Sequence, residues 1–412
     1  MLYHSSTDNS TTVSLSQAVR HSVAADKGVY IPNRIPLIPK AFFNNISEMS
    51  LADIGYVVAN MLFGEDIDSA TLKDIVTDTV NFDIPLRPLG RNLYSLELYH
   101  GPTGSYKDFG ARFMSRLHQK FIHTDNRSNI LIATRGDAGE AVARAFLGME
   151  NVKVFVLYPH LPDKSAKRRT NFTTLGKNII PVEVRGSFAE CMELVRMAAS
   201  DKSLQLDFDI QTANSLNIAR LLPQTFYFFY AFACLSRIVD VRKTRTVISI
   251  PVGNLGNLTS GLIAKRMGLP VDRFIVTRIS DTPYFLSEYL QTGKDPVDIP
   301  PGSVSPNFDR IRWLYGNDEK TLGKDIEIVS YPHTPEAVST CSDILDSAGR
   351  AALCALKERV KEDEIGIVLA TSSPQENEVY AGGTGVKRHA QLPPSYSVFK
   401  DYLQKNAFRR SY

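Results

Sequence analysis

A lysine in a loop of small residues could carry covalent chemistry. Lys107 follows the run H-G-P-T-G-S-Y at residues 100–106, where a helix is expected to begin. The helix N-terminal dipole and partial burial both lower the pKa of an amine, and Schiff-base chemistry requires a neutral amine. We therefore predict Lys107 as a catalytic residue with a lowered pKa. The alternative is an ordinary surface lysine.

A second segment is typical of anion binding. Residues 247–261 read as a buried strand, a polar loop and a helix, and the loop holds Gly253, Asn254, Leu255, Gly256 and Asn257. Backbone N–H groups at such a turn form a phosphate cradle, with the asparagine side chains as further donors. The glycine spacing is not the dinucleotide fingerprint, and no Gly-Lys-Ser/Thr of a P-loop follows. The alternative is an ordinary strand-to-helix turn.

A third segment repeats this arrangement at residues 132–143, which read I-A-T-R-G-D-A-G-E-A-V-A. Asp137 is expected to be the N-cap of the following helix. A capped helix alone would explain the pattern. Two such loops in one sheet, however, favour a ligand with two anionic ends, such as a cofactor phosphate and an amino-acid carboxylate.

Alternating strands and helices must position these loops. Apolar runs at 129–133, 152–157, 247–250, 273–277 and 365–370 alternate with helical stretches at 138–147, 188–199 and 259–267. This pattern predicts an α/β fold with doubly wound parallel sheets and sites at the carboxyl ends of strands. Before residue 95 the pattern predicts helices at 14–25, 51–63 and 70–81, and the final helix is expected at 397–404.

Composition excludes several protein classes. The chain has 412 residues, 22% of them charged, and a net charge of +3, which predicts two or three domains and argues against a nucleic-acid binder. Its four cysteines, at 191, 234, 341 and 354, form no C-x-x-C pair, so neither a zinc site nor a disulfide framework is expected. The apolar stretch 225–235 is too short to cross a bilayer, and no signal segment is visible. We expect a cytoplasmic protein without membrane or nucleic-acid partners.

Several motifs resemble those of threonine synthases. Residues 100–108, H-G-P-T-G-S-Y-K-D, are similar to that family's lysine motif H-G-P-T-x-x-F-K-D. Four further segments resemble elements of the same family: D-K-G-V-Y-I-P at 26–32, T-L-G-K-N at 174–178, T-A-N-S-L-N-I-A-R at 212–220 and P-V-G-N-L-G-N at 251–257. The resemblance covers most of the chain. It implies a fold-type-II pyridoxal-phosphate enzyme, similar to the β-subunit of tryptophan synthase.

The resemblance implies a role for each matching residue. Lys107 would carry pyridoxal 5'-phosphate as a Schiff base and shuttle protons. The other cofactor-binding residues would be Asp137 beside the ring, Thr371 near the pyridine nitrogen, and Gly253, Asn254, Leu255, Gly256 and Asn257 at the phosphate. The substrate-binding residues expected are Thr134, Arg135, Asn214, Ser215, Asn217 and Arg220, and no metal is expected.

The family also implies a reaction and a domain plan. The reaction is that of O-phospho-L-homoserine and water, giving L-threonine and phosphate. The expected domains are a mostly helical N-terminal domain (1–97), a small α/β domain with the lysine (98–230) and a large α/β domain with the phosphate loop and C-terminal tail (231–412). A symmetric homodimer is the default expectation.

The departures from the family pattern fall at the active site. T-S-G-D-T-G becomes T-R-G-D-A-G at 134–139, Val252 replaces a serine, Ser373 replaces the histidine of T-A-H-P, and D-P-H-G-A becomes D-S-A-G-R at 346–350. Each lost polar partner in a desolvated site costs about 1–3 kcal/mol. Two alternatives therefore stay open: a diverged relative catalysing elimination or replacement on another activated amino acid, and a non-catalytic binding protein of the same fold.

Overall fold

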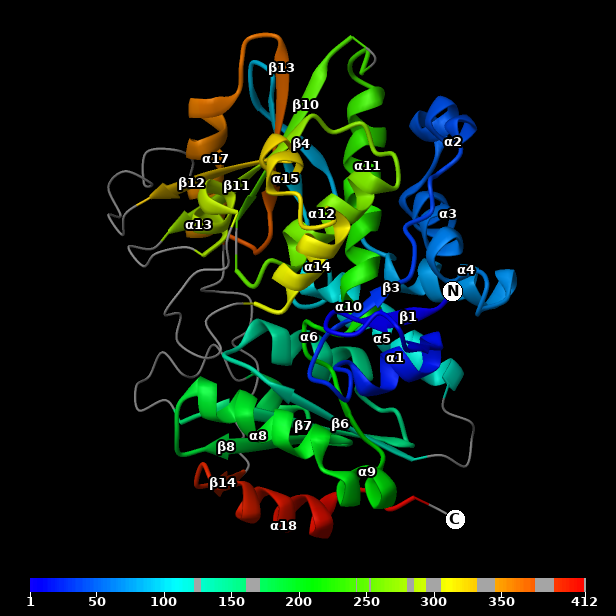
Figure 1. Ribbon diagram of the computed structural model, residues 1–412, viewed down its shortest axis with the longest axis vertical. Coiled ribbons are helices and arrows are strands. Elements are labelled where there is room, and N and C mark those ends of the chain that lie inside the picture. The colour runs from blue at the N-terminus through cyan, green and yellow to red at the C-terminus, as the bar shows by residue number, and fades with distance from the viewer. Residues whose placement is uncertain are drawn as a thin grey trace.

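The computed structural model describes residues 1–121, 127–160, 171–241, 243–251, 253–279, 285–293, 305–331, 345–374 and 389–410. Two parallel sheets lie one above the other in Figure 1, with the N-terminal region packed along their side. Val252 and Cys341, both named above, lie outside the described residues.

The larger sheet has six strands, in the order β12 (Ile326–Tyr331), β11 (Arg273–Ile279), β10 (Arg245–Pro251), β13 (Glu364–Ala370), β5 (Leu93–Glu97) and β4 (Leu86–Gly90). Neighbouring strands are parallel, except that β4 is antiparallel to β5. Its helices are α11 (Thr225–Ser236), α12 (Gly256–Arg266), α13 (Phe285–Thr292), α14 (Asn307–Leu314), α15 (Glu319–Asp325) and α17 (Ser347–Arg359).

Both faces of this sheet are buried. Val247 and Val368 pack with α17 in one core, whereas their neighbours Ile248 and Ile367 belong to the core that contains α11 and α12. Successive side chains of a strand point to opposite faces, so a strand covered on both sides reads as a continuous apolar run. The predicted doubly wound parallel sheet is confirmed.

The smaller sheet has five parallel strands, in the order β14 (Ala390–Leu392), β8 (Ile179–Val184), β7 (Val152–Pro159), β6 (Ser128–Ala133) and β9 (Ile210–Thr212). One core joins it to α5 (Lys107–Phe121) and α6 (Asp137–Phe146). The opposite core holds α8 (Phe188–Ser200), α9 (Lys202–Phe208) and α18 (Tyr396–Asn406).

The N-terminal region contains the expected helices and a small sheet that was not expected. Its helices are α1 (Leu15–His21), α2 (Lys40–Asn45), α3 (Leu51–Phe63) and α4 (Ser69–Thr79). The antiparallel strands β2 (Thr12–Val13), β1 (Tyr3–Ser5) and β3 (Tyr30–Pro32) form a three-stranded sheet. Strands of two or three residues are too short for a period-2 pattern to reveal them.

The two large sheets do not follow the linear division of the sequence. Strands β4 and β5, inside the first 97 residues, belong to the six-stranded sheet, whereas β14 and α18 near the end of the chain pack on the smaller sheet. Because the chain crosses between the sheets more than once, the domains are assembled from separated segments.

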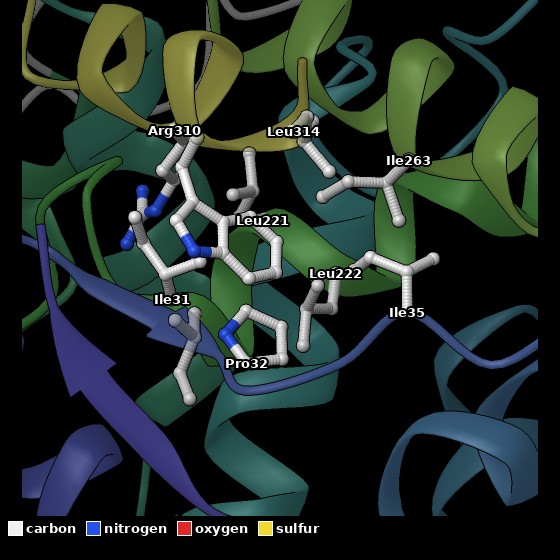
Figure 2. Close-up of a pocket in the computed structure, with 10 residues that line it drawn as sticks. Ile31, Pro32, Ile35, Leu221, Leu222, Ile263, Arg310 and Leu314 are labelled. Atoms are coloured by element: carbon white, nitrogen blue, oxygen red, sulfur yellow. The ribbon is translucent and has the colours of Figure 1, made fainter. Parts of the chain in front are cut away.

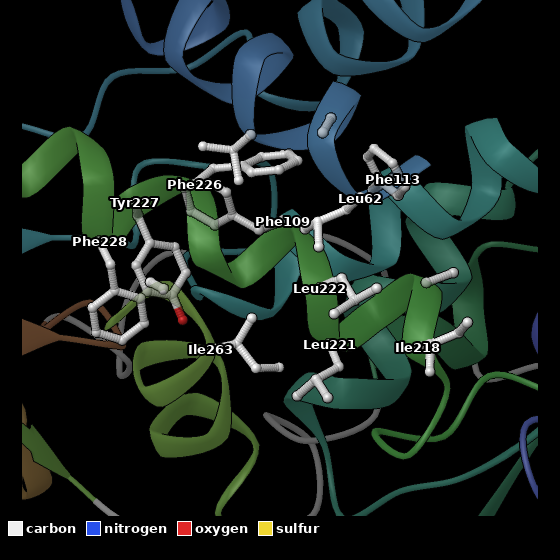
Figure 3. Close-up of a cluster of buried hydrophobic side chains, with 14 of the residues drawn as sticks. Leu62, Phe109, Phe113, Ile218, Leu221, Leu222, Phe226, Tyr227, Phe228 and Ile263 are labelled. Carbon is white, nitrogen blue, oxygen red and sulfur yellow. The ribbon is translucent and has the colours of Figure 1, made fainter. Parts of the chain in front are cut away.

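Helix α11 is the apolar stretch noted in the sequence. Together with the preceding turns, Ile218–Ser236 is long and apolar enough to cross a membrane, but 83% of that window is buried inside the protein. Its aromatic rings pack against α3 and α5, where Figure 3 shows Phe226, Phe109 and Phe113 close together. It is therefore a core helix.

One expectation about the cysteines is wrong. Cys354 on α17 is disulfide-bonded, whereas Cys191 and Cys234 are free. Because disulfides persist mainly in oxidising compartments, this bond does not support the expected cytoplasmic location.

Candidate active site

Lys107 lies where two strand-to-helix loops from different sheets meet. It is the first residue of α5, and its Nζ is 3.0 Å from Oδ2 of Asp137, the first residue of α6. The side chains are 27% and 52% exposed, so the ion pair is partly open to solvent. The structure thus brings together two predicted site residues that are thirty positions apart.

The predicted pKa of Lys107 is wrong in direction. Burial lowers the pKa of the amine, but the charge of Asp137, the interaction with Tyr106 and the hydrogen bond to Asp137 raise it, and the net pKa is raised. The amine is therefore held as a cation. Its reaction with a carbonyl requires loss of a proton from this ion pair.

The loop before Lys107 is fastened to the end of β13. Tyr106 N–H donates to the carbonyl of Thr371 at 3.0 Å, and Ser373 N–H donates to the carbonyl of Gly104 at 3.1 Å. Asp108 closes the loop by accepting from both the N–H and the hydroxyl of Thr103, each at 2.8 Å. Thr371 is therefore adjacent to the lysine loop.

The predicted phosphate loop has the form of an anion site. Helix α12 begins at Gly256, and Leu255 before it has a left-handed φ of 63°. A Cβ at Gly253 would meet no atom within 4 Å, so space lies beside the loop. Asn257 is buried, and its Nδ2 has no hydrogen-bond partner among the described residues. A buried donor without a partner beside a helix N-terminus fits a phosphate group.

The predicted substrate loop contacts the phosphate loop. Asn254 Nδ2 donates to the hydroxyl of Ser215, and the carbonyl of Asn254 accepts from Ser305 Oγ at 2.6 Å and Asn307 Nδ2 at 3.0 Å. The expected phosphate loop is thus joined directly to the expected substrate-binding segment at 212–220.

Arg220 is a buried cation beside this site. Its side chain is 5% exposed, Nη1 donates to the carbonyl of Ala213 at 2.6 Å, and Nε has no partner among the described residues. Burial lowers its pKa to about 10, and its charge acts on Lys107. No described carboxylate forms a salt bridge with Arg220. A buried guanidinium without a counter-charge favours an anionic ligand.

Two predicted substrate-binding residues have structural roles instead. The hydroxyl of Thr134 accepts from the N–H groups of Gly136 and Gly139, both at 2.9 Å. Asn217 caps α10 (Ile218–Leu221) through its Oδ1, and its Nδ2 donates to Val19 O, Ser22 Oγ and Thr212 O. Because these polar atoms are already paired, neither residue is placed to bind substrate.

Three further expectations are corrected. Arg135 is exposed, and its guanidinium lies 4.5 Å from the centre of the Phe188 ring, so it stacks on α8. Asn214 folds back to accept from Leu216 N–H at 2.9 Å in a local turn. The N-cap of α6 is Gly136 and not Asp137, whose carboxylate pairs with Lys107.

Comparison with known proteins gives the family. A model described as threonine synthase N terminus matches residues 2–80, and one described as pyridoxal-phosphate dependent enzyme matches residues 76–277. Threonine synthase of Haemophilus influenzae is 36% identical over 422 residues, covering 96% of each chain. That of Escherichia coli is 32% identical, covering 89% of this chain and 87% of the other. The chain belongs to the threonine synthase family.

Solved structures agree with this assignment. The crystal structure of threonine synthase from Escherichia coli matches with a TM-score of 0.85 and 27% identity, covering 98% of this chain and 100% of that one. The pyridoxal-phosphate-bound threonine synthase from Brucella melitensis shares the fold, with a TM-score of 0.82 at 22% identity over 99% of both chains. The protein is a fold-type-II pyridoxal-phosphate enzyme, as the resemblance implied.

Arg310, which was not predicted as a site residue, hydrogen-bonds to two of the segments that resemble threonine synthases, 26–32 and 212–220. Arg310 on α14 is 2% exposed, and its guanidinium donates to Tyr30 O, Leu216 O and Asn307 Oδ1, the last at 2.7 Å. Figure 2 shows it beside Ile31, at a small apolar cavity whose lining contains none of the predicted site residues. In the sequence it lies in the polar stretch P-N-F-D-R at 306–310, for which no role was predicted.

Asp346 was also given no role. It caps α17 by accepting from Gly349 N–H at 2.9 Å. Burial raises its pKa, and its charge interacts with those of Asp137 and Lys107. A second carboxylate therefore lies in the electrostatic surroundings of the lysine.

Proposed function

We propose that this protein converts O-phospho-L-homoserine and water to L-threonine and phosphate. The observation that carries the proposal is Arg220, a buried guanidinium without a described carboxylate partner, whose charge acts on Lys107. Together with the loop at Asn257, it provides two anion-binding positions around one lysine. A phosphorylated amino acid and a phosphorylated cofactor require two such positions.

The described residues fit pyridoxal phosphate. When bound, the cofactor supplies an electron sink for carbanions of the amino-acid substrate. Its phosphate would lie on residues 253–257, where Asn257 presents an unpartnered donor. Thr371 would approach the pyridine nitrogen, and Lys107 would provide the amine for covalent attachment.

Lys107 and its neighbours would handle the protons. Overall, the C–O bond at Cγ breaks and phosphate leaves with the bonding electrons; water adds a hydroxyl at Cβ, while Cγ becomes a methyl group. Lys107 Nζ, once freed from Asp137, would accept and return protons at the substrate carbons. Arg220 would hold the leaving phosphate, since a guanidinium is a suitable partner for phosphate oxygens.

The altered loop at 134–139 does not by itself indicate another substrate. The guanidinium of Arg135 stacks on Phe188, and Thr134 is retained in a structural role. We therefore favour the threonine synthase reaction over elimination or replacement on a different amino acid. We also favour a catalytic role over a non-catalytic binding role, because Lys107 is held by Asp137 at the meeting point of the two loops.

The test is direct. Purified protein is incubated with O-phospho-L-homoserine, and phosphate and threonine are both measured. Equal release of the two supports the proposal. Phosphate without threonine indicates a different elimination, and neither product, despite a visible cofactor absorption band, indicates a different substrate. Lys107→Ala should lose the band and the activity together.

The homodimer and the cytoplasmic location stay predictions. The homodimer is proposed because two-fold assemblies are the commonest oligomers. Multi-angle light scattering of the full chain would measure it, and a mass of about 46 kDa would contradict it.

A further inference from the structure

A tyrosine hydroxyl in the aromatic core contacts the phosphate loop. Tyr227 on α11 is fully buried, and its hydroxyl donates to Asn257 Oδ1 at 2.8 Å; a longer contact of 3.3 Å reaches Gln224 Oε1. Phe226 and Phe228 on either side are purely apolar. Figure 3 shows the hydroxyl of Tyr227 directed toward the helix that carries Ile263, which is α12.

This contact determines which end of the Asn257 amide stays free. A side-chain amide has an acceptor oxygen and a donor nitrogen of similar size, so it can lie either way round. Because the Tyr227 hydroxyl occupies Oδ1, the atom that no described residue pairs with is the donor Nδ2, buried in the first turn of α12. The reversed amide would present its oxygen, which repels an anion.

We propose that Tyr227 is a positioning residue for cofactor binding. It holds the Asn257 amide so that Nδ2 is available to the cofactor phosphate. This inference rests on the cofactor assignment under the proposed function. The Tyr227 ring also packs edge to face on Phe109, with centroids 5.1 Å apart, two residues beyond Lys107. A phenylalanine at 227 would keep that packing and lose only the hydroxyl.

The experiment compares two ligands that differ by one phosphate. Dissociation constants of pyridoxal phosphate and pyridoxal are measured by absorbance for the full-length protein and for Tyr227→Phe. We expect pyridoxal phosphate to bind about three- to tenfold more weakly, as the loss of one oriented hydrogen bond predicts. Pyridoxal, which lacks the phosphate, should bind equally to both proteins. Tyr230→Phe, on the same helix but half-buried and beside Cys234, is the matched control and should change neither constant.

A double-mutant cycle shows whether Tyr227 acts through Asn257. In the Asn257→Ala background, Tyr227→Phe should cause no further loss of affinity for pyridoxal phosphate. If the two losses add, or if Tyr227→Phe lowers the melting temperature while both ligands bind as in wild type, the inference is wrong.

A second variant covers the case in which Tyr227→Phe is too unstable to purify. Asn257→Asp keeps the acceptor for the tyrosine but places a carboxylate oxygen where Nδ2 lies. It should weaken pyridoxal phosphate more than tenfold and leave pyridoxal unchanged, and wild-type binding of both would overturn the inference. If the wild-type protein itself binds no pyridoxal phosphate, the proposed function fails with it; if wild type binds and the variants are unaffected, only the role of Tyr227 fails.

Discussion

The ion pair of Lys107 with Asp137 sets the starting charge of the active site. Lys107 was identifiable from its motif, yet its pKa was predicted in the wrong direction. The effects of the helix dipole and of burial can be inferred from the residues around Lys107, whereas the carboxylate of Asp137 follows a strand of the other sheet. The sequence therefore predicted the lysine that would carry the cofactor, but not the carboxylate that raises its pKa.

Removing that carboxylate should change the pH dependence of cofactor attachment. In Asp137→Asn the main interaction that raises the Lys107 pKa is lost, so the pKa should fall. The visible absorption band of the protein with pyridoxal phosphate should then appear at lower pH than in wild type, as a spectroscopic titration would show. An unchanged or upward-shifted midpoint would mean that Asp137 does not control the amine.

His118 should make the fold sensitive to mild acid. It is fully enclosed, its Nε2 contacts Gln211 Oε1 at 2.9 Å, and its Nδ1 has no partner in the described part of the chain. Burial lowers its pKa from 6.5 to about 4, against smaller opposing effects of Gln211 and Asp209. The folded state thus favours the neutral ring, so its contribution to stability is complete above pH 6.5 and is lost as the pH falls toward 4.

Urea unfolding at several pH values measures this loss, which is at most about 3 kcal/mol for such a shift. His118→Gln should show a smaller decrease in the free energy of unfolding between neutral pH and pH 4.5. Asp209, whose pKa is lowered, is present in both proteins and serves as the internal reference. If the free energy of unfolding decreases equally with pH in the two proteins, the prediction is contradicted.

Elements were easier to predict than their partners. The strands around 129–133, 247–250 and 365–370 and the helices around 51–63 and 188–199 lie close to the observed β6, β10, β13, α3 and α8. Thr134 and Asn217, by contrast, were assigned to substrate because they match motif positions of the threonine synthase family. The partners that occupy Asn217, Val19 and Ser22, are about two hundred positions away, and periodicity carries no information about them.

The approach of α5 to α10 depends on a glycine. A Cβ at Gly110 would lie 2.3 Å from the carbonyl oxygen of Arg220, so Gly110→Ala must push the two helices apart and displace Arg220. We expect a loss of about 1–3 kcal/mol in stability, as for other overpacked sites. The KM for the phosphorylated substrate should rise together with this loss.

Gly323→Ala on α15 is the matched control. The nearest atom to its added Cβ is 3.9 Å away, so the alanine fits without displacement. The melting temperature should equal or slightly exceed that of wild type, and KM should stay near the wild-type value. Wild-type behaviour of Gly110→Ala would show that α5 and α10 can separate without consequence for the site.

At the scale of the whole molecule, Arg310 fastens the N-terminal region to the active site. Its guanidinium joins the carbonyl of Tyr30 in β3 to that of Leu216 and, through Asn307, to the phosphate loop. Burial lowers its pKa to about 9. The N-terminal residues 2–80, which match a family model of their own, are therefore part of the support of the site.

Arg310→Met should loosen that support. It leaves several buried carbonyl groups without donors, which costs about 2–4 kcal/mol in total. Hydrogen exchange should increase in β3 and at residues 214–217 together, and cofactor affinity should fall. Arg312→Met, on the same helix but with its Nε on Asn317 at the surface, should leave both regions as in wild type. Increased exchange in β3 alone would show that the N-terminal region is not coupled to the site.

The order of strands in the sheets has a consequence for synthesis on the ribosome. Strand β5 (Leu93–Glu97) pairs in parallel with β13 (Glu364–Ala370), and the smaller sheet is completed by β14 (Ala390–Leu392). One edge of β5 therefore has no native partner until β13 has been translated, about 270 residues later. The nascent protein therefore carries an open strand edge during this part of its synthesis, and such an edge is prone to aggregation until it is paired.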